Sequence, residues 1–267
     1  MSIFLCLMFG LLISYSTACD RCVHQSKAAY FTSSSSLSTG ACEYGSLALS
    51  FNGGHLAAGV PSLFRQGVGC GACFQIRCKN QKICSSGGTK VIITDLNHKN
   101  KTDFVLSNRA FRAMAVDGKS RDLLKLRVVD VEYKRIPCEY KSKNLSVKIE
   151  EKSLKPNYLA IKFLYQGGQT DIVAVDIAQV GSANWRYMSR NANGVVWETS
   201  RVPTGALQIR MLVTGGFDGK MIWAKNEVIP ANWKVGEIYD SGVQITDVAQ
   251  EGCSSSSTSV CEHEHWN

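Results

Sequence analysis

The sequence lacks a second long apolar run, a run of basic residues and a nucleophile motif. After residue 18 no apolar stretch is long enough to cross a membrane, which argues against a transmembrane helix beyond that point. The formal net charge is +8, but the basic residues are scattered, and no basic helix or recognition motif points to nucleic acid. His24, His55 and His98 do not sit in a nucleophile motif, which argues against a Ser-His-Asp hydrolase.

The N-terminus predicts where the protein works. Residues 2–18 carry no charge, are apolar from Ile3 to Ile13, and end with the small residues Ser16 and Ala18. This pattern is typical of a secretory signal peptide and is too short for a usual membrane span, although an uncleaved anchor is the alternative. We expect a soluble, secreted monomer, and outside the cell its basic excess favours anionic partners such as acidic polysaccharides.

The cysteines agree with secretion. Cys6 lies in the predicted signal, and ten cysteines remain, at positions 19, 22, 42, 70, 73, 78, 84, 138, 253 and 261. An even number in an oxidising compartment indicates disulfides. Two CxxC spacings, 19–22 and 70–73, are also found in zinc knuckles and redox motifs. A zinc site needs four converging ligands and a redox CxxC opens a helix, whereas glycines make 67–71 a turn. We predict structural disulfides, and spacing alone leaves their connectivity open.

Both halves of the chain are rich in predicted strands. In the first half, short runs of β-branched and aromatic residues predict strands at 74–78, 90–96 and 124–136. One helix is predicted from a Ser107 cap to Gly118, and a second helical piece around 57–64, where Pro61 limits its length. In the second half, alternating strands are predicted at 146–150, 158–165, 171–180, 206–214 and 221–229. Turns at regular intervals separate them, which is typical of an antiparallel β-sandwich. The domain boundary should fall between about residues 140 and 157.

Several motifs resemble the expansin family. In the first half they are GACEYG at 40–45, GCGACFQIRC at 69–78, ITD at 93–95, LSNRAFRAMA at 106–115 and RIPC at 135–138. In the second half they are NYLAI at 157–161, WRYMSRN at 185–191 and IPANW at 229–233. The match covers nearly all of the predicted mature chain in the family's order. The CDRC start and the cysteine-containing tail are most similar to the plant expansin-like A subgroup.

The resemblance implies a mostly β protein with two domains. These are a six-stranded double-psi β-barrel, related to family forty-five endoglucanases, and an immunoglobulin-like β-sandwich that binds polysaccharide. The implied parts are a signal peptide (1–18), an N-terminal segment (19–38), the barrel domain (39–142), a linker with a first strand (143–156), the sandwich domain (157–240) and a tail (241–267). The family also suggests three disulfides, Cys42–Cys70, Cys73–Cys138 and Cys78–Cys84.

Expansins loosen plant cell walls without cutting glucans. By resemblance we expect a secreted cell-wall protein that binds wall polysaccharides, such as cellulose, xyloglucan or other matrix glucans, or pectin. No cofactor, metal, nucleic acid or membrane partner is implied. Two alternatives stay open at this point: a true endoglucanase, and a defence or inhibitor protein on a related barrel.

The barrel groove departs from the family pattern at its acid. The family has His-Phe-Asp before Leu-Ser, whereas this chain has Asp103-Phe104-Val105, so Val105 occupies the position of the acid. Asp103 lies two residues away and, if extended, roughly 6 to 7 Å along the groove. It is either a groove residue or a solvated loop residue near Lys99 and Lys101. A non-hydrolytic protein is therefore expected.

Other groove residues are predicted by resemblance. Asp95 matches the family and is either a groove residue or a strand-end carboxylate that satisfies turn amides. The family's Thr-Phe-Tyr-Gly is here Ala-Tyr-Phe-Thr at 29–32, which moves the hydroxyl by one residue, toward the other face of the strand. The groove contacts that we predict are Asp95, Asp103, Tyr30 and Tyr44.

The sandwich is predicted to bind sugar through exposed rings, because pyranose faces present C–H groups to aromatic surfaces. Tyr158 matches one family ring, but the Arg-Asn-Trp-Gly turn that supplies a second ring reads Arg-Asn-Ala-Asn-Gly at 190–194. Among the four tryptophans of the predicted sandwich domain (157–240), Trp185 and Trp197 flank the altered turn and rank above Trp223 and Trp233. The predicted contacts are Tyr158, Trp185 and Trp197, and weak binding is expected.

The sequence has two further patterns. The sequons at Asn100 and Asn144 predict glycosylation of a secreted protein. The tail from Cys261 to His265 alternates acidic residues with histidine, but no further ligands converge on it, so a mobile terminus is favoured over a metal site.

Overall fold

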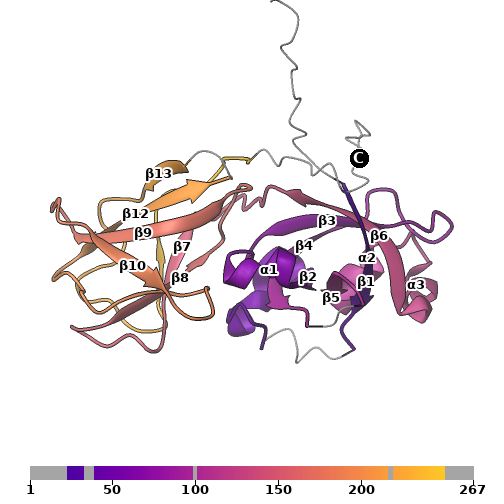
Figure 1. Ribbon diagram of the computed structural model, residues 1–267, viewed down its shortest axis with the longest axis horizontal. Helices are drawn as coiled ribbons and strands as arrows, with labels where there is room; N and C mark the ends of the chain where they lie inside the picture. Colours follow the sequence, from indigo (N-terminus) through magenta and orange to yellow (C-terminus); the bar gives the residue numbers. More distant parts are fainter. Residues whose placement is uncertain (1–22, 33–38, 99–100, 216–218, 250–267) are drawn as a thin grey trace, which may run out of the picture.

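The structure is a computed structural model that describes residues 23–32, 39–98, 101–215 and 219–249. Several predictions concern residues outside these ranges: the signal peptide, Cys19, Cys22, Cys253, Cys261, Lys99, the sequon at Asn100 and the histidines of the tail. Figure 1 shows two bodies side by side, with the N-terminal strands in one and the C-terminal strands in the other. None of the described helices has the length and apolar character needed to span a bilayer.

The first body is a closed β-barrel. Its strands are β1 (His24–Tyr30), β2 (Leu56–Gly59), β3 (Cys73–Cys78), β4 (Thr89–Leu96), β5 (Phe104–Leu106) and β6 (Val128–Ile136). They hydrogen-bond in the order β1-β5-β2-β4-β3-β6, and β1 runs parallel to β5 and β2 parallel to β4. Side chains alternate across each strand, so Phe104 and Leu106 are buried in the core while Val105 is half-buried on the opposite face. The closed six-stranded barrel confirms the predicted barrel.

The second body is one curled antiparallel sheet. Its strands are β7 (Ser146–Ile149), β8 (Leu159–Leu164), β9 (Asp171–Gln179), β10 (Arg186–Arg190), β11 (Trp197–Thr199), β12 (Leu207–Thr214), β13 (Gly219–Trp223) and β14 (Ile238–Asp240). Their order is β13-β12-β9-β10-β11-β8-β7-β14. Because the sheet curls, inner residues of distant strands, such as Ile149, Val175 and Met211, share one core. This confirms the predicted sandwich class.

The described helices are short. They are 3-10 helices over Gly45–Gly54 and Arg65–Gly67, and α1 (Pro61–Phe64), α2 (Asn108–Ala113) and α3 (Ser120–Leu126). Ser107 caps α2 as predicted, since its Oγ accepts a hydrogen bond from the amide of Ala110 at 3.2 Å. The same hydroxyl donates to the carbonyl of Gly54 at 2.8 Å, which ties the helix start to the barrel wall.

Three predicted elements need correction. The helical piece expected around 57–64 is β2 followed by the four-residue helix α1, which begins at Pro61 because proline suits a first helical position. The strand expected at 124–136 begins only at Val128, because residues up to Leu126 belong to α3. The strand expected at 221–229 ends at Trp223, and Ile229 forms only an isolated bridge to Leu207.

Three disulfides support the barrel. They pair Cys42 with Cys70, Cys73 with Cys138 and Cys78 with Cys84, which are the pairs that the resemblance implies. Cys138 also exchanges two backbone hydrogen bonds with Gly168 of the sandwich, at 2.8 and 3.0 Å. The cross-link from β3 therefore leads directly to the junction between the domains.

One carboxylate dominates that junction. Asp171, at the start of β9, accepts two hydrogen bonds from the guanidinium of Arg65, at 2.5 and 2.9 Å, and one from Arg135 at 2.8 Å. Burial alone would raise the pKa of Asp171, but the hydrogen bond from Arg65 and the charge of Arg135 outweigh burial and lower this pKa. Asp171 is therefore ionised at neutral pH and joins two barrel segments to the sandwich.

The backbones of the two domains also approach closely. A Cβ added to Gly194 would lie within bonding distance of the carbonyl oxygen of Gln66, and Gly194 has φ +72°. A Cβ added to Gly67, which has φ +89°, would lie 2.5 Å from the carbonyl oxygen of Asn193. Side chains at either position would separate the domains, so both glycines are required by packing as well as by backbone conformation.

We predict that Asp171→Asn lowers the free energy of unfolding by about 2 kcal/mol. The substitution leaves Arg135, whose side chain is 12% exposed, without its counter-charge, and Arg65 is exposed enough that the loss falls below that of a fully buried pair. Urea unfolding at pH 7 measures the loss. Asp130→Asn is the matched control, because the Lys27–Asp130 pair is 59% and 64% exposed and should contribute less than about 1 kcal/mol.

The ion pairs of Asp171 also predict how the stability of the protein changes with pH. Because the folded-state pKa of Asp171 is lowered, its stabilisation is present above the unfolded-state pKa, about 3.9, and is lost as pH falls through the lowered pKa. The stability difference between wild type and Asp171→Asn should therefore shrink below about pH 4. A difference that stays constant from pH 7 to pH 3 would contradict this role.

Candidate functional site

A row of side chains crosses four barrel strands on the face opposite to the barrel core; Ala29, Asp95 and Val105 are half-buried there and Ala58 is buried. Ala58 of β2 pairs with Asp95 of β4 on one side and with Val105 of β5 on the other, and Val105 pairs with Ala29 of β1. Paired residues point to the same face, and this face is opposite to the buried Phe104. Two strand spacings place Asp95 and Val105 roughly 10 Å apart. We call Asp95, Ala58, Val105 and Ala29 the barrel row.

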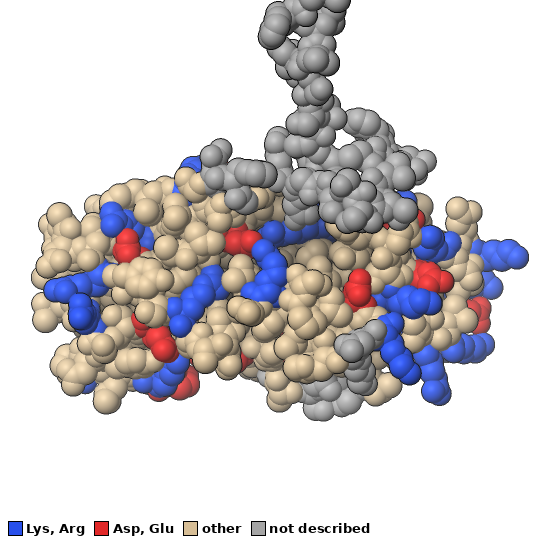
Figure 2. All heavy atoms as spheres, in the orientation of Figure 1, with Lys and Arg blue, Asp and Glu red and all other residues tan. Residues whose placement is uncertain are grey.

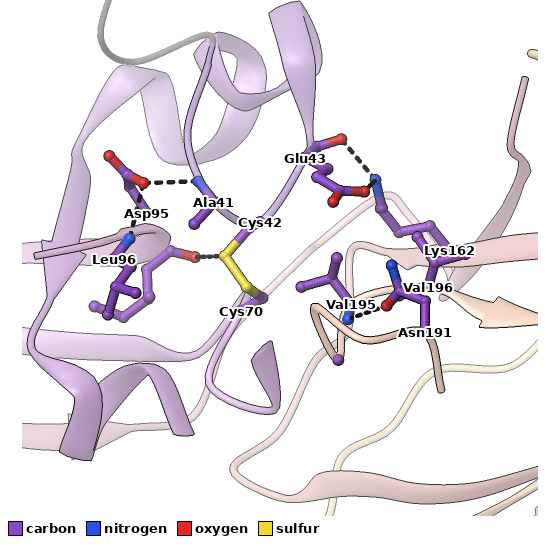
Figure 3. Close-up of a disulfide and its surroundings, with 12 residues drawn as sticks. Ala41, Cys42, Glu43, Cys70, Asp95, Leu96, Lys162, Asn191, Val195 and Val196 are labelled. Atoms are coloured by element: carbon purple, nitrogen blue, oxygen red, sulfur yellow. Dashed lines mark hydrogen bonds and ion pairs between the residues drawn. A yellow bond between two sulfur atoms is a disulfide. The ribbon is translucent and has the colours of Figure 1, made fainter. Parts of the chain in front are cut away.

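Asp95 fulfils the structural role that the sequence left open. Its Oδ1 accepts hydrogen bonds from the amides of Ala41, at 2.6 Å, and Leu96, at 2.8 Å (Figure 3). A Cβ on Gly40 would lie 2.4 Å from the carbonyl oxygen of Thr94, so only glycine allows this turn to approach β4. Asp95 thus holds the turn at 40–42 while its side chain remains half-exposed on the barrel row.

Asp103 extends the face of Val105. It directly precedes β5 and is half-buried. Its amide donates to the carbonyl of Lys27 at 3.1 Å, and its carbonyl accepts from the amide of Val60 at 3.0 Å. The backbone is therefore fixed on both sides, and alternation places Asp103 on the side of Val105, roughly 7 Å farther along the strand.

The two predicted groove tyrosines lie elsewhere. Tyr30 sits on the core side of β1, where its ring is 4.8 Å from that of Phe111 and its hydroxyl donates to the carbonyl of Leu124 at 3.3 Å. This agrees with the shift of the hydroxyl to the other strand face, and it corrects the prediction that Tyr30 contacts substrate in the groove.

Tyr44 points to the domain junction instead of the barrel row. It borders a small cavity of about 50 Å³ there, and its ring meets Phe51 edge-on at 4.9 Å. Burial, and then the neighbouring Tyr140, raises the pKa of the Tyr44 hydroxyl. The predicted groove contact of Tyr44 is therefore corrected to a contact at the junction.

Lys162 of β8 completes that junction. The side chain is 2% exposed, and its Nζ donates to the carbonyl of Glu43 at 2.6 Å (Figure 3). Its Nζ also lies 3.4 Å from the Glu150 carboxylate. Burial lowers the pKa of Lys162, and these acidic neighbours oppose the shift. The contact fixes the turn after Cys42 against the sandwich.

An open hollow joins the turn held by Asp95 to the sandwich. Its volume is about 810 Å³. Gly40, Ala41 and Leu96 line its barrel side, and Ala192 and Asn193 of the altered turn line its sandwich side. The hollow therefore borders the turn that Asp95 holds, and the turn at 190–194 on its sandwich side carries no large ring.

A second hollow, of about 530 Å³, lies on the outer face of the sandwich. Two of the three predicted ring residues, Tyr158 and Trp185, line it together with Tyr187 and Glu198. The hydroxyl of Tyr158 donates to Glu198 at 2.7 Å. Burial and this hydrogen bond raise the pKa of Tyr158, so its ring is neutral and held in place at physiological pH.

A ring-bearing row leads away from this hollow across the sheet. Tyr187 of β10 pairs with Asp176 of β9, Asp176 with Arg210 of β12, and Arg210 with Trp223 of β13. Tyr187 is 60% exposed and Trp223 is 53% exposed. Asp176 accepts from the Nε of Arg210 at 2.9 Å, so the charges between the rings are paired. We call Tyr187, Asp176, Arg210 and Trp223 the sandwich row.

Arg210 supports two tryptophans at once. Its guanidinium lies 4.4 Å from the ring centroid of Trp185 and 5.3 Å from that of Trp223. The two rings meet edge-on at 5.2 Å. Trp185 is therefore joined to the sandwich row, and the described rings form one continuous surface from Tyr158 to Trp223.

The ranking of the tryptophans needs correction. Trp197 is 3% exposed and packs in the sandwich core, with Arg190 stacked on its ring at 4.4 Å, so it cannot contact a polysaccharide. Trp223, which the sequence analysis ranked below it, is exposed beside Trp185. Alternation along β13 carried the missing signal, because Ile222 packs on the core and its neighbours face outward.

The sequon at Asn144 lies at the surface. Asn144 is half-buried just before β7, and its Nδ2 donates to Asp240 at 3.2 Å. A glycan at this position remains a prediction.

A double-psi β-barrel followed by a ring-bearing β-sandwich defines the two-domain expansin architecture. A family profile described as lytic transglycolase matches residues 56–133, and one described as expansin C-terminal domain matches residues 145–230. The chain is 60% identical over 268 residues to expansin-like A1 from Arabidopsis thaliana, covering 99% of this chain and 98% of that one. It is 53% identical over 242 residues to expansin-like A3 from Oryza sativa subsp. japonica, covering 89% and 87%. The chain belongs to the expansin-like A family.

Solved structures share the fold. The apo expansin of Clavibacter michiganensis has a TM-score of 0.62 at 16% identity, covering 83% of this chain and 97% of that one. A mutant of the same expansin in complex with cellohexaose gives the same values. At this identity the likeness concerns the fold alone.

We predict that Arg210→Gln loosens the pair of tryptophans. Removing a guanidinium stacked on exposed rings should cost about 0.5–1 kcal/mol and release Trp185 and Trp223 from their edge-on contact. Near-ultraviolet circular dichroism should shift toward the spectrum of Trp223→Phe, in which the pair is absent. Arg210→Lys, which keeps a cation, should stay close to wild type; equal spectra for wild type and Arg210→Gln would contradict the supporting role.

Proposed function

We propose that the protein is a secreted cell-wall protein that binds wall polysaccharides through the sandwich and loosens the wall without hydrolysis. The observation that carries the proposal is the continuous ring surface of Tyr158, Trp185, Tyr187 and Trp223 on the outer face of the sandwich. Rings exposed in sequence suit the apolar faces of pyranoses. An expansin of the same fold is in complex with cellohexaose, which supports a glucan-type ligand.

The barrel supports binding better than cleavage. Glycoside hydrolysis needs two carboxyls, separated by about 5 to 9.5 Å depending on the mechanism. Asp95 and Asp103 lie two strands apart and two residues out of step, which separates their Cα atoms by roughly 12 Å. Val105 stands nearer to Asp95, but its side chain has no acidic group that could donate a proton. The carboxylates of this face are therefore suited to hydrogen bonds with sugar hydroxyls.

Sliding of glucan chains is the proposed mechanism of loosening. The hollow of the junction is open to solvent, and the sandwich offers rings that hold a chain without enclosing it. Because Asp171 and Lys162 fix the two domains, a chain bound by the rings stays in a constant position relative to the barrel. The bound protein then competes for the non-covalent contacts between neighbouring wall polymers, and no glycosidic bond has to break.

We predict that Trp185→Ala, Tyr187→Ala and Trp223→Ala each weaken retention on insoluble polysaccharide about fivefold. Each removes a stacking contact worth on the order of 1 kcal/mol. Depletion isotherms against cellulose and xyloglucan-coated cellulose measure the loss, and Tyr158→Ala should behave alike. Leu126→Ala, which removes a 48% exposed apolar side chain of the barrel, is the control and should bind normally. Unchanged isotherms for all four ring variants would place binding elsewhere.

We predict no release of reducing ends from soluble glucan by wild type, Asp103→Asn or Val105→Asp between pH 4 and 7, roughly the range in which carboxyls titrate. Val105→Asp adds a carboxyl to the barrel row but no second catalytic base. Asp103→Asn should change wall binding by no more than about twofold, as expected for a surface substitution.

An authentic endoglucanase on the same substrate serves as the positive control. Hydrolysis by wild type that Asp103→Asn abolishes would establish an endoglucanase instead. Tight capture of one protein partner, with no retention on any wall fraction, would establish an inhibitor.

A further inference from the structure

The hollow on the sandwich carries unequal charge. Arg186 and Arg201 line it, and Glu198 is the acidic residue in its lining. The Glu198 carboxylate already accepts hydrogen bonds from Lys152 at 2.6 Å and from Tyr158 at 2.7 Å. The hydrogen bond from Lys152 lowers the pKa of Glu198, and its negative charge is thereby matched within the protein. No other carboxylate in the lining balances the positive charges of Arg186 and Arg201.

Neither arginine has an acidic partner in the part of the chain that the structure describes. Four of the other arginines do: Arg65, Arg77, Arg135 and Arg210 each form an ion pair with a carboxylate. Arg186 and Arg201 are both exposed and line the same hollow as Trp185 and Tyr187. Two unmatched guanidinium groups beside aromatic rings distinguish this hollow from the rest of the sandwich row, where Asp176 matches Arg210.

The chemistry of these side chains selects a ligand class. A guanidinium keeps its charge at any wall pH, and its forked donors fit a carboxylate in bidentate fashion. The neighbouring rings suit the apolar faces of sugars. A sugar that offers both an apolar face and a carboxylate is a uronate.

We propose that this hollow binds uronate-bearing polysaccharide, with Arg186 and Arg201 pairing with its carboxylates while Trp185 and Tyr187 contact the sugar faces. The inference rests on the proposed function, because it names the class of polysaccharide that the sandwich prefers. It goes beyond the net charge, because it assigns the preference to two residues among the basic side chains that Figure 2 shows over both domains.

The test compares two double variants of the full-length secreted protein that lose the same charge. Arg186→Gln/Arg201→Gln removes the two arginines of the hollow. Arg112→Gln/Arg121→Gln removes two exposed arginines of α2 and α3 on the barrel and serves as the matched control. Thermal unfolding midpoints verify that both variants are folded. The probes are polygalacturonate, its fully methyl-esterified form, and cellulose, each immobilised.

The ratio of binding to polygalacturonate over binding to its methyl ester is the decisive readout. This ratio should exceed one for wild type and fall about threefold to tenfold in the hollow variant, since each exposed ion pair contributes modestly. The barrel variant should keep the ratio within about twofold, and added salt should reduce it for wild type.

The other possible outcomes contradict the inference. Equal losses in the two double variants would show that net charge alone attracts the polymer, which overturns the inference. A wild-type ratio of one would do the same. Retention on cellulose that Trp185→Ala weakens, together with no effect of the hollow variant on the ratio, would leave the proposed function standing and remove the inference. Wild-type protein that binds none of the three polymers would overturn both.

Discussion

The hydrogen bonds that Asp171 accepts from Arg65 and Arg135 set the geometry on which the surfaces of the protein depend. The two arginines come from separate barrel segments, so one carboxylate of the sandwich binds both segments. Removing charged groups from water costs free energy, and the hydrogen bonds that Asp171 accepts from Arg65 and Arg135 offset this cost. The close backbone approach at Gly67 and Gly194 adds a second contact between the domains. A fixed junction keeps the barrel and the sandwich in one relative orientation.

The sequence predicted the fold well where the patterns were long. Four alternating strands of the sandwich, at 146–150, 158–165, 171–180 and 206–214, and the barrel strands at 74–78 and 90–96 were located to within a few residues, and the resemblance supplied their arrangement. Elements without such a pattern were missed: β5 has three residues, and β1 is mostly polar or small. Helix α3 was taken for strand because leucine alternates with basic residues at 124–127, a pattern that a helix end shares over so short a span.

The site was predicted in part, because composition does not reveal which face of a strand is buried. The family motif predicted that Val105 replaces the acid, and turn chemistry predicted that Asp95 holds a turn. Trp197 and Trp223 both lie in strands. Alternation along β13 indicates that Trp223 faces away from Ile222, whereas the three-residue strand β11 is too short to show that Trp197 is in the core. The two arginines of the hollow were equally hidden, since their lack of an acidic partner is a property of three-dimensional neighbours.

Sheet twist gives the sandwich row a consequence for the shape of its ligand. Tyr187 and Trp223 are separated by three strand steps. Neighbouring strands rotate by roughly 20–25°, so the supports of these two rings differ in direction by about 60–75°. The rings therefore form a spiral ramp instead of a level platform. A ramp follows a single polymer chain that can rotate about its linkages.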